Sequence, residues 1–145
     1  MLGRVTGFAR RLVARLRPER ITLTPPPLTF TDGADREVVV RPVEDGDIES
    51  MVEMYDDFDP AQRAQGTPPL SEAAIRDWLD GVLDGPNVVA LVDGDVVGHV
   101  MFVPDDTGRH ELAIFVHQEF QRAGIGTNLL AVGLEHARRE GVEYV

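Results

Sequence analysis

One segment constrains the fold of this chain more than any other, because an apolar strand there runs through a glycine-containing loop into a helix. The strand is Glu111 to Val116, and the loop contains Gly124 and Gly126. At a helix N-terminus the first backbone N–H groups have no partner within the helix, and the helix dipole favours an anion. Glycine also lets a phosphate approach the backbone closely. The segment predicts an anion-binding turn, although turn glycines are also consistent with a purely structural role.

The pattern around this segment predicts an α/β fold, with a mixed sheet and flanking helices. Short apolar runs bounded by turn residues indicate strands, and apolar residues at helical spacing indicate helices. Asp93-Gly94 is a strong hairpin signal, and Ser71 is a good helix N-cap. The expected strands are 37–41, 88–92, 96–103, 110–116 and 142–145, and the expected helices are 45–55, 71–84 and 127–140.

Composition excludes several classes of protein. The 145 residues suit one domain, and they include neither cysteine nor lysine. Disulfides, thiolate nucleophiles, a Walker A loop and Schiff-base chemistry are therefore excluded. The four histidines show no metal-ligand spacing, so no metal site is expected. No apolar run approaches the roughly 18 residues of a membrane-spanning helix, and Leu129 stands where a dinucleotide fingerprint needs glycine or alanine.

The N-terminal segment differs from the rest of the chain in charge. Residues 1–20 carry six Arg and one Glu, a net charge of +5, whereas the remaining residues carry eight Arg and 24 acidic side chains, a net charge of −16. Residues 1–36 are interpreted as a basic amphipathic helix followed by a linker containing Pro25–Pro27. Such a helix suits a membrane surface, an acidic partner or, by charge complementarity, the acidic body of this chain itself.

The acidic, lysine-free body also bears on the environment of the protein. It suits a halophilic cytoplasm, where high salt screens self-repulsion. The alternative is an ordinary acidic protein from a GC-rich genome. Either way, nucleic acid is not expected as a main partner.

The motif in the loop resembles that of a known family. Gln121-Arg-Ala-Gly-Ile-Gly126 is similar to the acetyl-CoA-binding motif, Q/R-x-x-G-x-G/A, of the GCN5-related N-acetyltransferases (GNAT). Val40-Arg41-Pro42, with Asp45 and Asp47, resembles the first strand and helix opening of the family. The amino-acid sequence of the strand that begins at Glu111 resembles that of bacterial and archaeal protein-lysine acetyltransferase domains. The resemblance covers residues 37–145.

The resemblance implies direct transfer of an acetyl group from acetyl-CoA to an amine. Glu111 would be the general base that removes a proton from the acceptor ammonium, and a backbone N–H near Val116 would stabilise the oxyanion. Arg122 would contact phosphate or remain a solvated arginine. The implied acetyl-CoA-binding residues are Ile114, Phe115, Val116, Gln121, Arg122, Ala123, Gly124, Ile125, Gly126 and Thr127.

The resemblance leaves several questions open. The family fold continues past the fifth strand with another helix, which usually supplies a tyrosine acid, and two further strands. We therefore expect residues 37–145 to be a C-terminally incomplete N-acetyltransferase domain, and the activity of the 145-residue chain itself is open. Two other functions fit: a non-catalytic acyl-CoA-binding or regulatory module, and an interaction protein acting through the arginine helix. The acceptor, a protein or a small molecule, is not determined.

Overall fold

The sheet of this protein is antiparallel throughout its described part. The computed structural model describes residues 21–63, 67–143 and 145. Five strands lie in the order β1-β2-β3-β4-β5, and each pairs antiparallel with its neighbour. They are β1 (Leu28–Thr31), β2 (Glu37–Pro42), β3 (Asn87–Val92), β4 (Asp95–Pro104) and β5 (His110–Val116).

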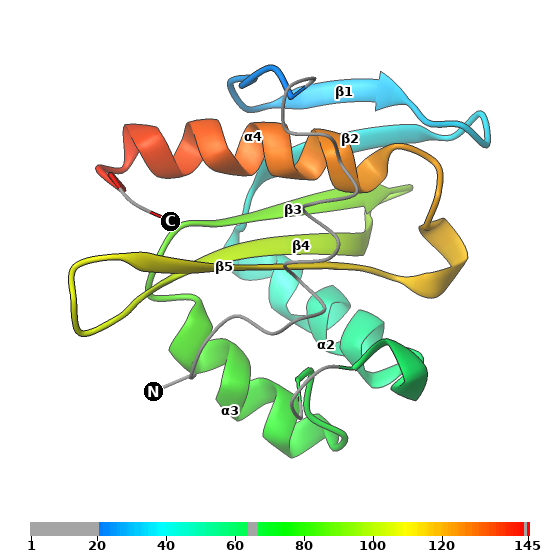
Figure 1. Cartoon of the computed structure of the whole chain (residues 1–145). Coiled ribbons are helices and arrows are strands. Elements are labelled where there is room, and N and C mark those ends of the chain that lie inside the picture. Colours follow the sequence, from blue (N-terminus) through cyan, green and yellow to red (C-terminus); the bar gives the residue numbers. More distant parts are fainter. Residues whose placement is uncertain (1–20, 64–66, 144) are drawn as a thin grey trace.

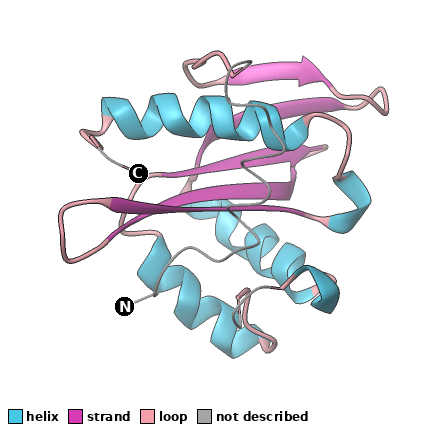
Figure 2. Ribbon diagram, viewed as in Figure 1, coloured by secondary structure: helices cyan, strands magenta, loops and turns pink. Residues whose placement is uncertain are grey.

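Three α-helices of the described residues cover the two faces of this sheet (Figure 1). They are α2 (Ile48–Asp56), α3 (Glu72–Val82) and α4 (Ile125–Arg139), and short 3-10 helices span Asp45–Asp47, Pro60–Gln62 and Gln118–Phe120. α4 packs on one face, and α2 and α3 pack on the other (Figure 2). Along β5 the side chains alternate between these layers, since Leu112 and Ile114 join the core under α4 while Phe115 joins the core under α2 and α3. The predicted α/β fold is confirmed.

The structure contains the helix cap and the hairpin turn that local sequence signals predict. The Ser71 hydroxyl accepts a hydrogen bond from the Ala74 N–H at 3.1 Å, and α3 begins at the next residue. Asp93 and Gly94 both have positive φ, 52° and 83°, as a tight hairpin turn between β3 and β4 requires. Arg41 forms a bidentate pair with Asp47, at 2.7 and 2.9 Å, which ties the end of β2 to the start of α2.

A buried chain of hydrogen bonds joins α2 to β3 and β4. The side-chain nitrogen of Asn87 donates to backbone carbonyls, so its oxygen accepts from His99 Nε2 at 2.6 Å. His99 Nδ1 then accepts from the Tyr55 hydroxyl at 2.7 Å. His99 is fully buried, and burial lowers its pKa to about 3. The imidazole is therefore neutral, with its proton on Nε2.

The N-terminal part of the sheet corrects the predicted linker over residues 21–36. Residues 28–31 form strand β1, which pairs with β2 from Leu28↔Val40 to Thr31↔Glu37. Leu28 and Phe30 pack against the core under α4, so the alternation of a half-buried strand is present although only four residues long. The arginine-rich helix predicted within residues 1–20 lies outside the described residues.

Two further details differ from the prediction. No strand forms at the described residues among 142–145, so the parallel pairing that would make the sheet mixed does not occur in the described chain. α4 begins at Ile125 rather than residue 127, because Gly124 takes a left-handed conformation, φ 91°, and serves as its N-cap. No helix among the described residues has the length and apolarity to cross a membrane.

Candidate active site

The outer edge of β5 offers backbone groups that no other described strand pairs with. The His117 N–H donates to the Val97 carbonyl, and the Asp105 N–H donates to the Arg109 carbonyl, at the two ends of the β4–β5 ladder. Along an antiparallel strand, the backbone N–H and C=O groups of successive residues point alternately to one side and to the other. The N–H groups of Leu112, Ile114 and Val116 therefore point away from β4, toward the outer edge.

Phe115 is a correction to the predicted cofactor-binding set. The same alternation turns its backbone groups toward β4, where it lies opposite His99. Its side chain packs edge-on against the rings of Tyr55, Phe58 and Trp78, with centroids 5.7, 5.7 and 6.0 Å away. The structure therefore places Ile114 and Val116, but not Phe115, at the outer edge.

The loop after β5 brings the helix N-terminus beside the end of that edge. Gln121 Nε2 donates to the Val116 carbonyl at 2.8 Å, which ties the loop to β5. Arg122 and Gly124 have positive φ, 61° and 91°, and reverse the chain into α4. Among the described residues no side-chain cap bonds to the start of α4, and the N–H groups of a first helical turn have no partner within the helix.

The residues around the start of α4 differ in burial. Ile125 is buried in the core and anchors the turn, whereas Arg122 and Gly124 are exposed. Ala123, Gly126 and Thr127 are partly buried. Among the described residues, a Cβ built on Gly126 would meet only Val116 Cγ2, at 3.9 Å, so this part of the structure leaves space around the glycine.

Glu111 lies on the same strand but at its other end. It stands opposite Val103, five residues before Val116, a separation of about 16 Å along a strand. Alternation places its partly buried side chain on the α2 and α3 face, like Ala113 and Phe115. The structure therefore brings the loop and Val116 together and holds Glu111 apart from them.

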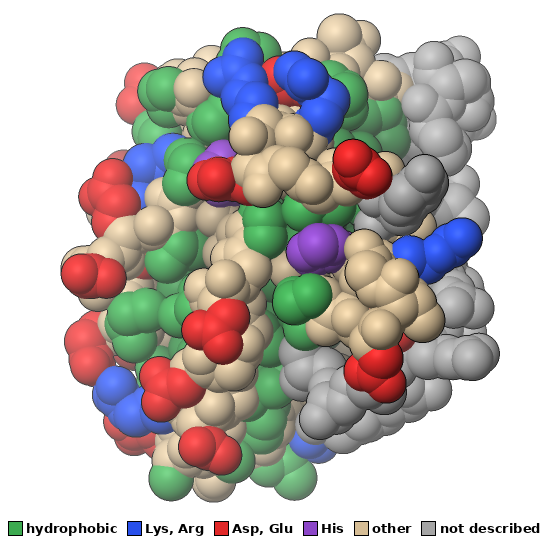
Figure 3. Space-filling model, turned by 90° about the vertical axis from the view of Figure 1, so that its left-hand side faces the viewer, with side chains coloured by type: hydrophobic (Ala, Val, Ile, Leu, Met, Phe, Trp, Pro, Cys, Tyr) green, Lys and Arg blue, Asp and Glu red, His purple; other side chains and the backbone are tan. Residues whose placement is uncertain are grey.

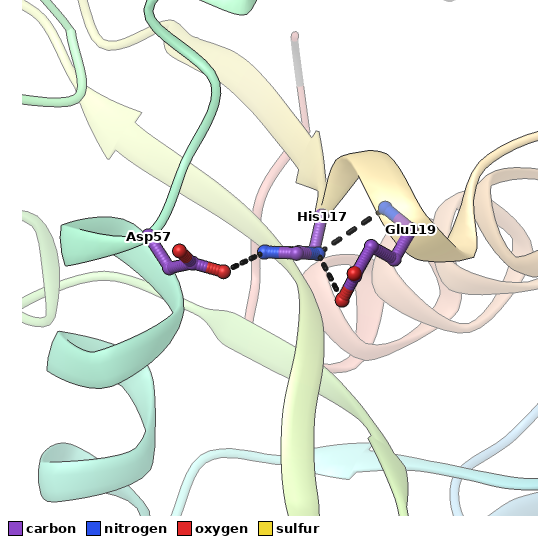
Figure 4. Close-up of side chains that lie close together, drawn as sticks. All are labelled: Asp57, His117 and Glu119. Atoms are coloured by element: carbon purple, nitrogen blue, oxygen red, sulfur yellow. Dashed lines mark hydrogen bonds and ion pairs between the residues drawn. The ribbon is translucent and has the colours of Figure 1, made fainter.

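A cluster that the sequence did not reveal lies at the C-terminal end of β5 (Figure 4). His117, with 7% of its side chain exposed, lies 2.8 Å from Asp57 through Nε2, and its Nδ1 accepts from the Glu119 N–H at 3.2 Å. The Glu119 carboxylate is 3.9 Å from Nδ1. The two carboxylates thus approach different nitrogens of the ring, and one ligand atom from each of the three residues lies within 4.8 Å of the others.

This cluster attaches the loop after α2 to β5. The Gln118 side chain donates to the Asp57 carbonyl and accepts from the Asp59 N–H, at 2.8 and 2.9 Å. Asp57 and His117 are sixty positions apart, and no spacing in the sequence signals their contact.

Charge is unevenly distributed over the face that contains the start of β5 (Figure 3). Acidic side chains are scattered over much of it, while arginine gathers at the top, over the end of α4. Arg138 and Arg139 lie in that last turn and both bond to Glu135. Hydrogen bonding to Arg138, outweighing the opposing effect of burial, lowers the pKa of Glu135 to about 2.

Comparison with known proteins decides the family. The family model described as the acetyltransferase (GNAT) family matches residues 48–145, more than half of the chain. The chain belongs to the GNAT acetyltransferase family. The acetyl donor of this family is acetyl-CoA. The predicted motif, Gln121–Gly126, lies in the loop after β5 and in the first turn of α4 of this GNAT domain.

Solved GNAT structures share the fold. The GNAT domain of PAT from S. lividans is 20% identical, covering 80% of this chain and 74% of that chain, with a TM-score of 0.61. A GNAT acetyltransferase from Brucella melitensis in complex with acetyl-CoA is 24% identical, covering 72% and 71%, with a TM-score of 0.57. A ribosomal-protein-alanine N-acetyltransferase from the same organism is 24% identical, covering 71% and 68%, with a TM-score of 0.56. No curated protein matches the sequence.

Proposed function

We propose that this GNAT domain transfers the acetyl group of acetyl-CoA directly to a primary amine of a protein or small molecule. The observation that carries the proposal is the junction of two features. The unpaired edge of β5 ends beside the uncapped N-terminus of α4. The first can pair with an extended amide-containing chain, as an added strand would, and the second can hold an anion. Acetyl-CoA carries both groups in one molecule.

The order of these features sets the direction of the bound acetyl-CoA. The pyrophosphate binds at the N–H groups from Arg122 to Thr127, and the pantetheine arm runs back along the outer edge of β5. The thioester therefore lies beyond Val116, toward the start of the strand. Ile114 is the next residue whose N–H points outward, and we assign it the oxyanion. Val116 then pairs with the arm.

This direction gives Glu111 a role in spite of its distance from the loop. Once the acceptor ammonium has lost one proton, the neutral amine attacks the thioester carbon and a C–N bond forms. The C–S bond breaks as CoA leaves as the thiolate, and the second proton lost by the nitrogen passes to that thiolate, which gives the amide and free CoA. The proton lost by the ammonium passes to the Glu111 carboxylate through water, because Glu111 is about 10 Å along the strand from Ile114. No acyl-enzyme is needed, and the chain has no cysteine to form a thioester.

The acceptor is proposed to be cationic before it reacts. Outside residues 1–20 the chain has 24 acidic side chains against eight Arg, and this charge attracts ammonium groups. The ribosomal-protein-alanine N-acetyltransferase among the neighbours acts, by its name, on a protein amine. The strand that begins at Glu111 also resembles protein-lysine acetyltransferases. A lysine side chain is therefore the first acceptor to test.

The test measures thiol release from acetyl-CoA with lysine peptides, peptide N-termini and small amines in turn, and mass spectrometry confirms the acetylated amine. We expect amine-dependent turnover that Glu111→Gln reduces while CoA binding remains. Glu37→Gln, on an exposed position of β2, is the matched control. CoA binding without turnover on any amine would instead indicate a non-catalytic module, and absence of CoA binding would refute the proposal.

A further inference from the structure

The turn between β1 and β2 contacts the loop that leads into α4, although the two are about ninety residues apart in sequence. The Gly33 N–H donates to the Ala123 carbonyl at 2.9 Å. A Cβ built on Gly33 would lie 3.4 Å from Ala123 Cα, so the two backbones are closely apposed. The guanidinium of Arg36 lies 4.4 Å from the ring centroid of Phe120, in the same loop. The turn thus contacts the loop at two points.

The turn itself is rigidly bonded. Asp32 is buried, and its carboxylate accepts from the N–H groups of Ala34 and Arg36, both at 2.9 Å, and from Arg36 Nε at 2.8 Å. Burial alone would raise the pKa of Asp32, but these hydrogen bonds outweigh it and hold the pKa below its usual value. The Asp35 N–H donates to the Asp32 carbonyl at 3.1 Å and closes a β-turn with Gly33 at its second position.

The hydrogen bond to Ala123 orients the peptide group that begins the phosphate-binding turn. The bond between Ala123 and Gly124 is trans, so its C=O and N–H point in opposite directions. Because the carbonyl points at Gly33, the Gly124 N–H points away from the β1–β2 turn. A carbonyl oxygen facing an anion would repel it. The hydrogen bond from Gly33 holds the Ala123 oxygen toward the β1–β2 turn and leaves the Gly124 N–H on the opposite side of the peptide group.

We propose that the β1–β2 turn, through Gly33 and Arg36, is a positioning element for the CoA pyrophosphate loop. This inference rests on the proposed function, because it assumes that the loop binds CoA. Arg36 positions the loop through Phe120, and Gly33 sets the direction of the Ala123–Gly124 peptide. Neither is assigned a contact with the reacting atoms.

The turn allows a sharp test of Gly33. Its φ is not in the left-handed region, and the second position of such a turn accepts proline. Gly33→Pro therefore suits the turn but removes the N–H and puts a ring carbon toward the Ala123 carbonyl. Gly33→Ala adds a Cβ and keeps the N–H, so it is the matched control. Arg36→Leu tests the second contact. Arg76→Leu is the control, since Arg76 pairs with Glu49 and Glu72 on the helices of the other face.

Calorimetric titration with CoA and with pantetheine, which lacks the pyrophosphate, gives the readout, and thermal melts check folding. The free energy of one hydrogen bond corresponds to a change of about two- to tenfold in affinity. We therefore expect Gly33→Pro and Arg36→Leu to lower the affinity for CoA by that factor. Pantetheine affinity should be unchanged in every variant, and both controls should bind CoA like the wild type.

The outcomes separate this inference from the proposed function. If wild-type protein does not bind CoA, the proposed function fails and the inference fails with it. If the wild type binds CoA and both Gly33→Pro and Arg36→Leu bind it equally well, only the inference is overturned. Equal losses for CoA and pantetheine would also overturn it, because a merely structural role affects both ligands. Should Gly33→Pro not fold, Arg36→Leu decides.

Discussion

Replacement of Gly126 separates folding from ligand binding more cleanly than any other change in the loop. Gly124 has φ 91°, so a side chain there strains the backbone, but Gly126 lies in α4 and carries no such constraint. In the described part of the chain, a Cβ at position 126 has one neighbour within 4 Å, Val116 Cγ2 at 3.9 Å. A side chain at this position therefore fits the protein and conflicts only with what binds there.

The expected magnitudes have opposite signs for stability and for binding. Gly126→Ala should raise the free energy of unfolding by up to about 1 kcal/mol, the difference in helix propensity. Gly126→Glu should also stabilise the fold, because an anionic side chain in the first turn of a helix contributes about 0.3–1 kcal/mol. The same carboxylate stands where phosphate oxygens should bind. CoA affinity should fall at least tenfold, about 1.4 kcal/mol.

Urea unfolding and calorimetric CoA titration on the same samples measure the two effects. Gly126→Gln, which has the size of Gly126→Glu without its charge, divides the loss between steric exclusion and repulsion. The difference between these two variants should shrink from 0.1 M to 1 M salt, as the Debye length falls from about 10 Å to about 3 Å. A folded Gly126→Glu protein with wild-type CoA affinity would refute the assignment of the pyrophosphate to this turn.

Three other predictions test the remaining groups. Glu111→Gln should lower turnover by about 10²–10⁴ at neutral pH, with a smaller loss at high pH where more acceptor amine is already neutral; wild-type rates at neutral pH would place the base elsewhere. His99 should make the fold less stable in acid. The unfolded chain binds the imidazole proton below pH 6.5, whereas the folded chain binds it only near pH 3. The free energy of unfolding therefore falls, by up to about 1.4 kcal/mol per pH unit, as the pH decreases through that window. Urea unfolding from pH 7 to 3 should show a shallower slope for His99→Gln, and an unchanged slope would contradict the buried neutral imidazole. The melting temperature should rise from 0.1 M to 1 M KCl, because salt screens the repulsion of the −16 body; a flat or falling curve would remove the halophilic interpretation.

Local signals in the sequence predicted most of the fold because each depends on neighbouring residues. Ser71 caps α3 through its own side chain, and Asp93-Gly94 adopts the positive φ values that its turn demands. β1 was missed because four residues after three prolines carry too little alternation to outweigh a linker. Its partner β2 supplies the backbone hydrogen bonds that make it a strand, and that partner is chosen by the tertiary fold.

The sequence located the loop after β5, while the binding of acetyl-CoA at that loop stays a prediction. The motif Gln121–Gly126 identified the loop, and its glutamine does bond to the end of β5. The error at Phe115 was avoidable, since two-residue alternation forbids three successive residues from presenting their backbone to the same edge. The contacts between His117 and Asp57, and between Gly33 and Ala123, join segments sixty and ninety positions apart. Neither contact leaves a periodic signal in the sequence.

Three carbonyl oxygens in and beside the loop accept hydrogen bonds from different parts of the chain, which favours the proposed anion binding there. The Val116 carbonyl accepts from the Gln121 side chain, within the motif. The Ala123 carbonyl accepts from Gly33 of the β1–β2 turn, and the Gly124 carbonyl accepts from Asn128 through both its backbone and its side chain. Because these carbonyl oxygens are already hydrogen-bonded, the N–H groups at the start of α4, which has no side-chain cap among the described residues, are the dominant dipoles of the loop. Of these three donors Gln121 alone belongs to the family motif, so the proposed anion site depends on parts of the chain that the motif does not contain.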